Sequence, residues 1–292
     1  MADPVSTPRR PFRWSAILDH GVLIAGALFM LIPVYLALTT ASHDKLLIQR
    51  EGLQWGFGDQ AGANFSAALF QSGGFTGEIT GATMLMNSFI LGIGFAIGKI
   101  VLSMMAAYAI VYFRLRFATQ AFWVIFTTLL LPLEVRIVPS YEVIQGLGLA
   151  NSYTGLIVPL LASATGTFFF RQFFLSIPEE LVDAARIDGA GPVKFFIDIL
   201  VPLSRTMIAA IFIIMYVYGW NQYLWPTLIT TEEGLFTLVR GIRQIVQAMA
   251  EGSEIPDYGR AMALAIIAMI PPVVIVITCQ SWFVKGLTES DK

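Results

Sequence analysis

The sequence predicts an all-α integral membrane protein with six transmembrane helices and one long charged loop. Of its 292 residues, 56% are hydrophobic and 13% are charged, whereas soluble domains carry about a quarter charged residues. Six apolar stretches reach the length of about 20 residues that a helix needs to cross a bilayer. Between the fourth and the fifth stretch, residues 176–203 carry charged side chains and glycines. These observations together indicate a multi-pass protein with a substantial segment outside the membrane.

The predicted spans are separated by polar segments and turn residues. They lie near 16–41, 84–112, 120–140, 154–175, 205–226 and 261–284. The second is long enough to tilt or to project from the bilayer. Pro132 and Pro139 interrupt the third, and backbone groups freed by proline in a membrane need partners from neighbouring helices or water.

Arginine and lysine residues predict the orientation. They precede the first span, follow the second, flank the charged loop and follow the last span, so with six spans they lie on one side. Both termini and the charged loop are therefore expected to be cytoplasmic. The expected parts are an N-terminal tail (1–15), a six-span domain (16–284), a C-terminal tail (285–292), and extracytoplasmic loops at 42–83 and 227–260.

The extracytoplasmic loop 227–260 contains the stretch TLVRGIRQIVQAMA. Its apolar residues recur at helical spacing. They are Leu238, Ile242, Ile245, Val246 and Met249. This predicts a short amphipathic helix at the outer face, whereas 42–83 is expected to be irregular with short elements.

The charged loop between the fourth and fifth spans predicts two short helices joined by a glycine turn. Ser176 and Glu179 have the spacing of a capping box at the start of the first helix. Gly189 suits the positive φ of a chain reversal after a helix. The second helix is expected to start near Pro192 and to end at Pro202.

Within this loop, DAARIDGAGPVKFFIDILVP resembles the EAA loop of ABC-importer permeases. The family pattern is E-A-A, three residues, G, nine residues, I-x-L-P; both gaps are kept, with Asp183 for Glu and Val201 for Leu. In that family the loop forms coupling helices that sit in a groove of the ATPase subunit, so residues 176–203 are called the coupling loop below. The alternative, a hairpin lying on anionic lipid, fits poorly with the acidic residues. The resemblance implies ATPase docking by Glu180, Asp183, Ala184, Ala185, Asp188, Gly189, Ile199 and Pro202.

Further stretches, among them LPLEVRIVPSYEVI and YGWNQYLWP, resemble permeases of carbohydrate-type importers, and most of all those of sn-glycerol-3-phosphate importers. The likeness covers the chain from about residue 16 to the C-terminus. It implies import of sn-glycerol-3-phosphate, with glycerophosphodiesters as related cargo, across the bacterial inner membrane by ATP-driven alternating access. A permease for a neutral sugar is the alternative. An ion-coupled secondary transporter is a rival of another class, but it has no need of a docking loop.

The resemblance also implies the partners. They are a second homologous permease, an ATPase homodimer, an extracytoplasmic solute-binding protein and the lipid bilayer. The chain has no GxxxxGK[ST] phosphate loop, so we expect no enzyme activity and no cofactor in this chain, with ATP and Mg²⁺ bound by the ATPase. One cysteine, Cys279, and two distant histidines predict no metal site. A net charge of −2 indicates no nucleic-acid partner.

Charged residues within the predicted spans need a reason, because each costs about 3 kcal/mol in hydrocarbon. Lys99 in the second span and Glu134 in the third lie at similar distances from the turn between them. An antiparallel hairpin would place them at similar depth. Lys99 is expected to pair with Glu134 or to join a small network with Arg136. The alternative is that Lys99 or Arg136 faces the pathway and attracts an anionic substrate.

Two other clusters suggest binding roles. Trp220, Asn221 and Tyr223 lie close together in the sequence at the outer end of the fifth span, and with Arg136 they are candidates to line the substrate pathway. An aromatic belt at the membrane interface is the alternative. Arg240 and Arg243 are three residues apart in the predicted outer helix, and by resemblance to a periplasmic loop of relatives they are candidates to contact the solute-binding protein.

Overall fold

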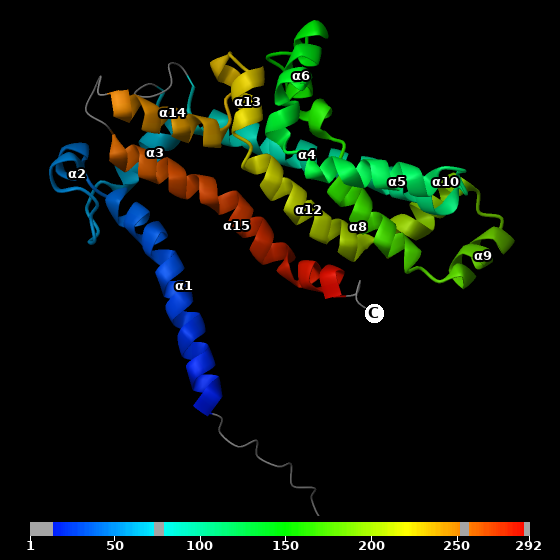
Figure 1. The fold of residues 1–292 in the computed structure, drawn as a ribbon. Coiled ribbons are helices and arrows are strands. Elements are labelled where there is room, and N and C mark those ends of the chain that lie inside the picture. Colours follow the sequence, from blue (N-terminus) through cyan, green and yellow to red (C-terminus); the bar gives the residue numbers. More distant parts are fainter. Residues whose placement is uncertain (1–13, 73–78, 252–256, 289–292) are drawn as a thin grey trace, which may run out of the picture.

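The fold is described from a computed structural model, which covers residues 14–72, 79–251 and 257–288 (Figure 1). Within these residues the regular structure is helical and contains no strand. The α-helices are α1 (Trp14–Thr40), α2 (Lys45–Glu51), α3 (Ala61–Phe70), α4 (Gly81–Tyr112), α5 (Ala118–Thr127), α6 (Leu133–Gly146), α7 (Tyr153–Ile157), α8 (Ala164–Leu175), α9 (Glu179–Ile187), α10 (Pro192–Lys194), α11 (Val201–Leu203), α12 (Arg205–Trp220), α13 (Leu224–Ile229), α14 (Leu238–Glu251) and α15 (Tyr258–Thr288). Short 3₁₀ turns cover Thr128–Leu130, Val158–Leu160 and Glu233–Leu235, and a π-helix covers Phe195–Leu200.

Three helices in the described part of the chain are long and apolar enough to cross a membrane unbroken: α1, α4 and α15. Three bent pairs supply the rest if each is one span: α5 with α6 at 105°, α7 with α8 at 49°, and α10–α11 with α12 at 75°. This agrees with six predicted spans but corrects their shapes. The predicted fourth span breaks at residues 161–163, and the predicted fifth ends at Trp220, six residues early.

Helix α4 is the centre of the bundle and packs on both α8 and α12. Two facing glycines bring α4 and α12 close together. A Cβ at Gly219 would lie 2.9 Å from the Cβ of Phe95, and one at Gly92 would lie 2.9 Å from the Tyr216 ring. Small residues permit such close contact between helices in lipid, where packing replaces the hydrophobic effect.

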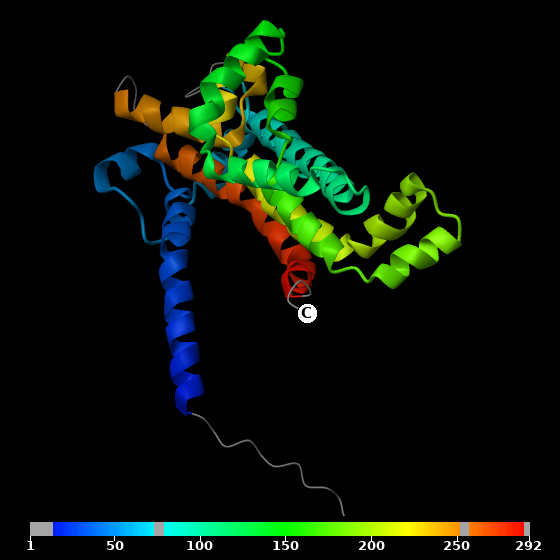
Figure 2. The same cartoon turned by 45° about the vertical axis from the view of Figure 1, so that its right-hand side comes forward.

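Helix α1 leaves the bundle, as both views show (Figure 2). It contacts α15 towards its Thr40 end, whereas the side chains of Val22, Phe29 and Met30 are largely exposed. An apolar helix with this much free surface is typical of one that faces lipid or another membrane protein.

The end of the bundle away from α9 is held together by long-range hydrogen bonds. The Asn87 side chain donates to the carbonyls of Gly234 (2.8 Å) and Phe236 (2.9 Å). The backbone N–H of Leu238 donates to the Ser88 hydroxyl (2.8 Å). These bonds seat α14 across the start of α4, and this confirms the predicted amphipathic helix; the side chains of Val246 and Met249 lie outside the described residues.

Candidate functional site

The first helix of the coupling loop, α9, ends in the predicted glycine turn. Gly189 has φ +72°. Its N–H donates to the Arg186 carbonyl (3.0 Å), and the Ala190 N–H donates to the Ala185 carbonyl (2.9 Å). This is a Schellman motif, in which glycine avoids the cost of a left-handed backbone.

The predicted capping box at the start of α9 is wrong. The Ser176 hydroxyl donates to the Phe173 carbonyl (2.7 Å) and so closes the end of α8. Helix α9 begins after Pro178, with no side-chain cap. Glu179 and Glu180 stand in its first turn instead, where negative charge is stabilised by the helix dipole.

The second helical segment of the coupling loop starts at Pro192, as predicted, and runs to Leu203. Pro202 does not end it directly, because the bend into α12 follows at Ser204. The six-residue π-helix stands just before Val201 and Pro202. Proline has no N–H to donate to the carbonyl four residues earlier, and a locally wider turn is a common adjustment at functional sites.

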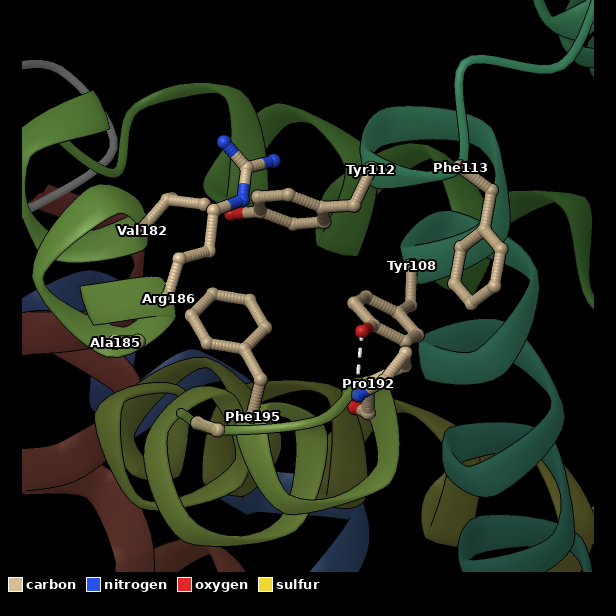
Figure 3. A pocket seen from close by; sticks show the side chains of 9 residues that line it. Tyr108, Tyr112, Phe113, Val182, Ala185, Arg186, Pro192 and Phe195 are labelled. Atoms are coloured by element: carbon tan, nitrogen blue, oxygen red, sulfur yellow. Dashed lines mark hydrogen bonds between the residues drawn. The ribbon is translucent and has the colours of Figure 1, made fainter. Parts of the chain in front are cut away.

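Two tyrosines of α4 hold the coupling loop and the end of α8 that precedes it, and we call them the aromatic clamp (Figure 3). The Tyr108 hydroxyl donates to the Pro192 carbonyl (2.9 Å), and the Tyr112 hydroxyl donates to the Phe174 carbonyl (3.2 Å). The Phe195 ring packs against both tyrosines. A cavity of about 280 Å³ remains between the clamp and α9. A movement of the coupling loop would therefore act directly on the central helix.

Six of the eight predicted docking residues are exposed: Glu180, Asp183, Ala184, Asp188, Gly189 and Pro202. The other two point inward, since Ala185 lines the cavity under the loop and Ile199 packs against the core. Sequence reasoning missed two apolar side chains on the loop surface, Ile187 (86% exposed) and Val193 (71% exposed). They lie beside the glycine turn. An apolar residue among polar neighbours in the sequence is the signal that could have identified them as contact residues.

A second cavity, of about 700 Å³, lies where two of the bent pairs, α5 with α6 and α7 with α8, are broken and where α12 ends. Its walls come from the breaks between α5 and α6, between α7 and α8, and after α12. We call it the central cavity. Lys99 and three of the predicted pathway residues line it: Arg136, Asn221 and Tyr223.

The fourth predicted pathway residue, Trp220, lies outside the central cavity. Its side chain is 2% exposed, its ring stacks on Tyr216, and its indole N–H donates to the Ala268 carbonyl of α15 (3.1 Å). Trp220 therefore joins α12 to α15. Adjacent residues on a helix point in different directions, so a cluster in sequence does not share one cavity.

Lys99 is 7% exposed. Its ammonium lies 5.2 Å from the Phe95 ring centre and 5.0 Å from that of Tyr218. It makes no ion pair or hydrogen bond with any described side chain. The positive charge of Arg136 is close enough to repel it. The side chain of Glu134 lies outside the described residues, so the Lys99–Glu134 ion pair stays a prediction.

Arg240, a predicted contact for the solute-binding protein, is 8% exposed and engaged within the chain. Its guanidinium donates to the carbonyl and the hydroxyl of Thr230 (2.5 Å each) and to the Pro226 carbonyl (3.2 Å). Burial lowers the pKa of Arg240, while Tyr223 acts in the opposite direction. This geometry argues against the predicted contact, because the end of α13 already uses the side chain.

Arg243, the other predicted contact, is exposed. Its guanidinium lies 4.8 Å from the centre of the Tyr223 ring. Because Tyr223 lines the central cavity, Arg243 stands close to the cavity wall. Of the two arginines, only Arg243 is exposed, and its contact with a solute-binding protein stays a prediction.

Residues 99–289 match the protein family described as the binding-protein-dependent transport system inner membrane component. The chain belongs to this family. It is 46% identical to the sn-glycerol-3-phosphate transport system permease protein UgpE of Rhizobium meliloti (strain 1021), over 97% of this chain and 99% of that protein. It is also 46% identical to the protein of that name from Yersinia pestis bv. Antiqua (strain Antiqua), over 94% of this chain and 97% of that one.

A solved structure shares the fold, with a TM-score of 0.77 over 96% of this chain and 100% of that one, at 18% identity. It is the crystal structure of a bacterial ABC transporter involved in the import of the acidic polysaccharide alginate. The predicted family, the all-helical permease fold and the multi-pass inner-membrane location are thereby confirmed.

Proposed function

We propose that this chain is a permease subunit of an ABC importer that carries sn-glycerol-3-phosphate across the bacterial inner membrane. The observation that carries the proposal is 46% identity over 97% of the chain to a permease of that name. The central cavity supports an anionic cargo, because Lys99 and Arg136 line it and no carboxylate stands among its described lining residues. Glycerophosphodiesters share the phosphate group and are proposed as related cargo.

The energy source in this proposal is a separate ATPase homodimer, which binds ATP and Mg²⁺; this chain holds no cofactor and catalyses no reaction. The coupling loop docks on the ATPase. Exposed Glu180 and Asp183 supply charge, and exposed Ile187 and Val193 supply apolar anchors. Buried apolar anchors within a polar rim carry most of the energy of such interfaces. The aromatic clamp then transmits the movement of the loop to α4, which turns the cavity outward.

The remaining partners follow from the same proposal. A second, homologous permease and lipid cover the bundle, including the exposed surface of α1. Both termini and the coupling loop are cytoplasmic, because arginine and lysine gather on that side. A solute-binding protein meets the opposite end, where α14 presents Arg243.

Uptake by the complete complex in proteoliposomes tests this function. We expect ATP inside the vesicles to drive accumulation of labelled sn-glycerol-3-phosphate, and unlabelled glycerol-3-phosphate to compete where a neutral disaccharide does not. If the complex took up only a neutral sugar in an ATP-dependent manner, the proposed substrate would be wrong and the neutral-sugar alternative would hold. Uptake driven by an ion gradient without ATP would contradict the importer class altogether.

A further inference from the structure

The central cavity contains two positively charged side chains, and the contacts that stabilise the fold do not explain them. Lys99 is nine-tenths buried, and Phe95 and Tyr218 are its only described contacts of the kinds that stabilise charge. Aromatic faces stabilise a desolvated ammonium only partly. A charge at this depth is normally paired or functional. A second cation, Arg136, lines the same cavity, and its repulsion increases the free-energy cost of keeping Lys99 charged.

The broken spans add further positive potential. Helix α8 begins at the central cavity, where Ala164 and Thr165 are lining residues. Its cap, Ser163, satisfies the N–H of Gly166 (3.2 Å) but not the two amides before it. The amides of a helix N-terminus favour an anion, and helices broken at mid-membrane present such ends to substrates in transporters.

We propose that Lys99 and Arg136 form an anion subsite that receives the phosphate group of the transported ester. The inference rests on the proposed function and adds to it a location within this subunit. Arg136 is exposed to the cavity and supplies a planar set of donors that matches phosphate oxygens. Lys99 supplies a buried point charge in the same cavity.

The rest of the cavity fits the other half of such a cargo. Tyr218, Asn221 and Tyr223 line it with groups that can hydrogen-bond hydroxyls. The Asn221 amide nitrogen already donates to the Val217 carbonyl (2.9 Å), so its oxygen is the group that can accept a hydrogen bond from a hydroxyl. A small polyol phosphate would thus meet both cations and neutral polar groups in the same cavity.

Ligand-induced stabilisation of the purified complete complex, without the solute-binding protein, tests the subsite separately from uptake. A ligand that binds only the folded state raises the unfolding temperature. We expect sn-glycerol-3-phosphate to raise it in the unaltered complex, and glycerol at the same concentration to leave it unchanged. The rise should disappear in Lys99→Gln and in Arg136→Gln, while Lys99→Arg keeps part of it.

The matched control is Lys45→Gln, which removes the same charge from the exposed surface of α2. It should keep the full response to sn-glycerol-3-phosphate. Arg136→Gln guards against misfolding of the Lys99 variant, because Arg136 is exposed. In uptake assays each loss of a charged contact should raise KM roughly tenfold or more.

Three results would overturn the subsite. One is a response to sn-glycerol-3-phosphate that survives in both variants, and another is no response in the unaltered complex. The third is stabilisation by phosphatidylglycerol in place of the soluble ester, since a lipid headgroup also offers a phosphate. Absence of glycerol-3-phosphate uptake by the unaltered complex would instead count against the proposed function, while the stabilisation measurement would still decide the subsite.

Discussion

The two cavities of this protein differ in how their walls are held. Under the coupling loop, a cavity of about 280 Å³ is lined in part by aromatic rings, and two tyrosine hydroxyls donate hydrogen bonds to backbone carbonyls. The central cavity, about 700 Å³, has walls made of helix breaks and carries Lys99 and Arg136. The first wall is suited to transmit a movement as a unit. The second offers charge and polar groups, and is suited to hold a solute.

Charge reversal in the central cavity should have the largest effect. We expect Lys99→Glu to abolish uptake, because it places a negative charge where the phosphate binds. The double variant Lys99→Glu with Glu134→Lys separates the two explanations of Lys99. An ion pair predicts that uptake returns in the double variant, whereas the anion subsite predicts that it stays absent. The measurement is uptake, normalised to the amount of assembled complex.

Disruption of the loop surface comes next. Ile187→Asp puts a charge at an apolar side chain that is 86% exposed. The bundle should therefore still fold, whereas binding of the ATPase subunit to the coupling loop should be lost. We expect co-purification of the ATPase with the permease to fall more than tenfold, since truncated anchors cost about 2 kcal/mol or more. Leu115→Asp, at another exposed loop residue, is the control. Full retention of the ATPase in Ile187→Asp would remove this residue from the interface.

The glycine turn should respond to backbone strain alone. Gly189 has φ +72° with open space around its Cα, so Gly189→Val costs about 1–2 kcal/mol through its left-handed backbone. Gly189→Asn should cost less, because asparagine tolerates this region. The transport rate should therefore be highest in the unaltered protein, lower in Gly189→Asn and lowest in Gly189→Val. Equal activity of the Asn and Val variants would mean that the turn can change shape without loss.

Loosening the aromatic clamp should give a moderate effect on coupling. Tyr108→Phe and Tyr112→Phe remove one hydroxyl each and keep the rings. Each hydrogen bond contributes about 1 kcal/mol, so the double variant should hydrolyse ATP but transport several-fold less solute per ATP. Tyr35→Phe, which removes a hydrogen bond to the Trp55 carbonyl at the other end of the bundle, is the control. Unchanged solute per ATP in the double variant would rule out the clamp as the transmitting contact.

The surface ion pair of α9 should matter least. Asp183 and Arg186 lie 3.0 Å apart with both side chains more than half exposed. Such pairs contribute roughly 0–1 kcal/mol, so Arg186→Gln should shift the unfolding temperature very little. A large loss of transport without loss of stability would show that Arg186 contacts the partner rather than supporting the helix.

Local patterns in the sequence were sufficient for much of this protein. Hydropathy predicted six spans because the bilayer requires about 20 apolar residues per helix. The spacing around Gly189 predicted the reversal because few residues other than glycine accept its backbone angles. Helical periodicity predicted α14. These features depend on the chain's own composition and neighbours, so a single sequence carries them.

The directions of individual side chains depended on partners far along the chain. Ser176 has the sequence spacing of a cap for α9 but bonds to the end of α8. Arg240 turned inward because carbonyls at the end of α13 accept hydrogen bonds from its guanidinium. Tyr108 meets Pro192, 84 positions away. The amino acids thus specified the spans, the turn and the family, whereas only the packed bundle decided which charges share the central cavity, because that requires three separate helix breaks to meet in space.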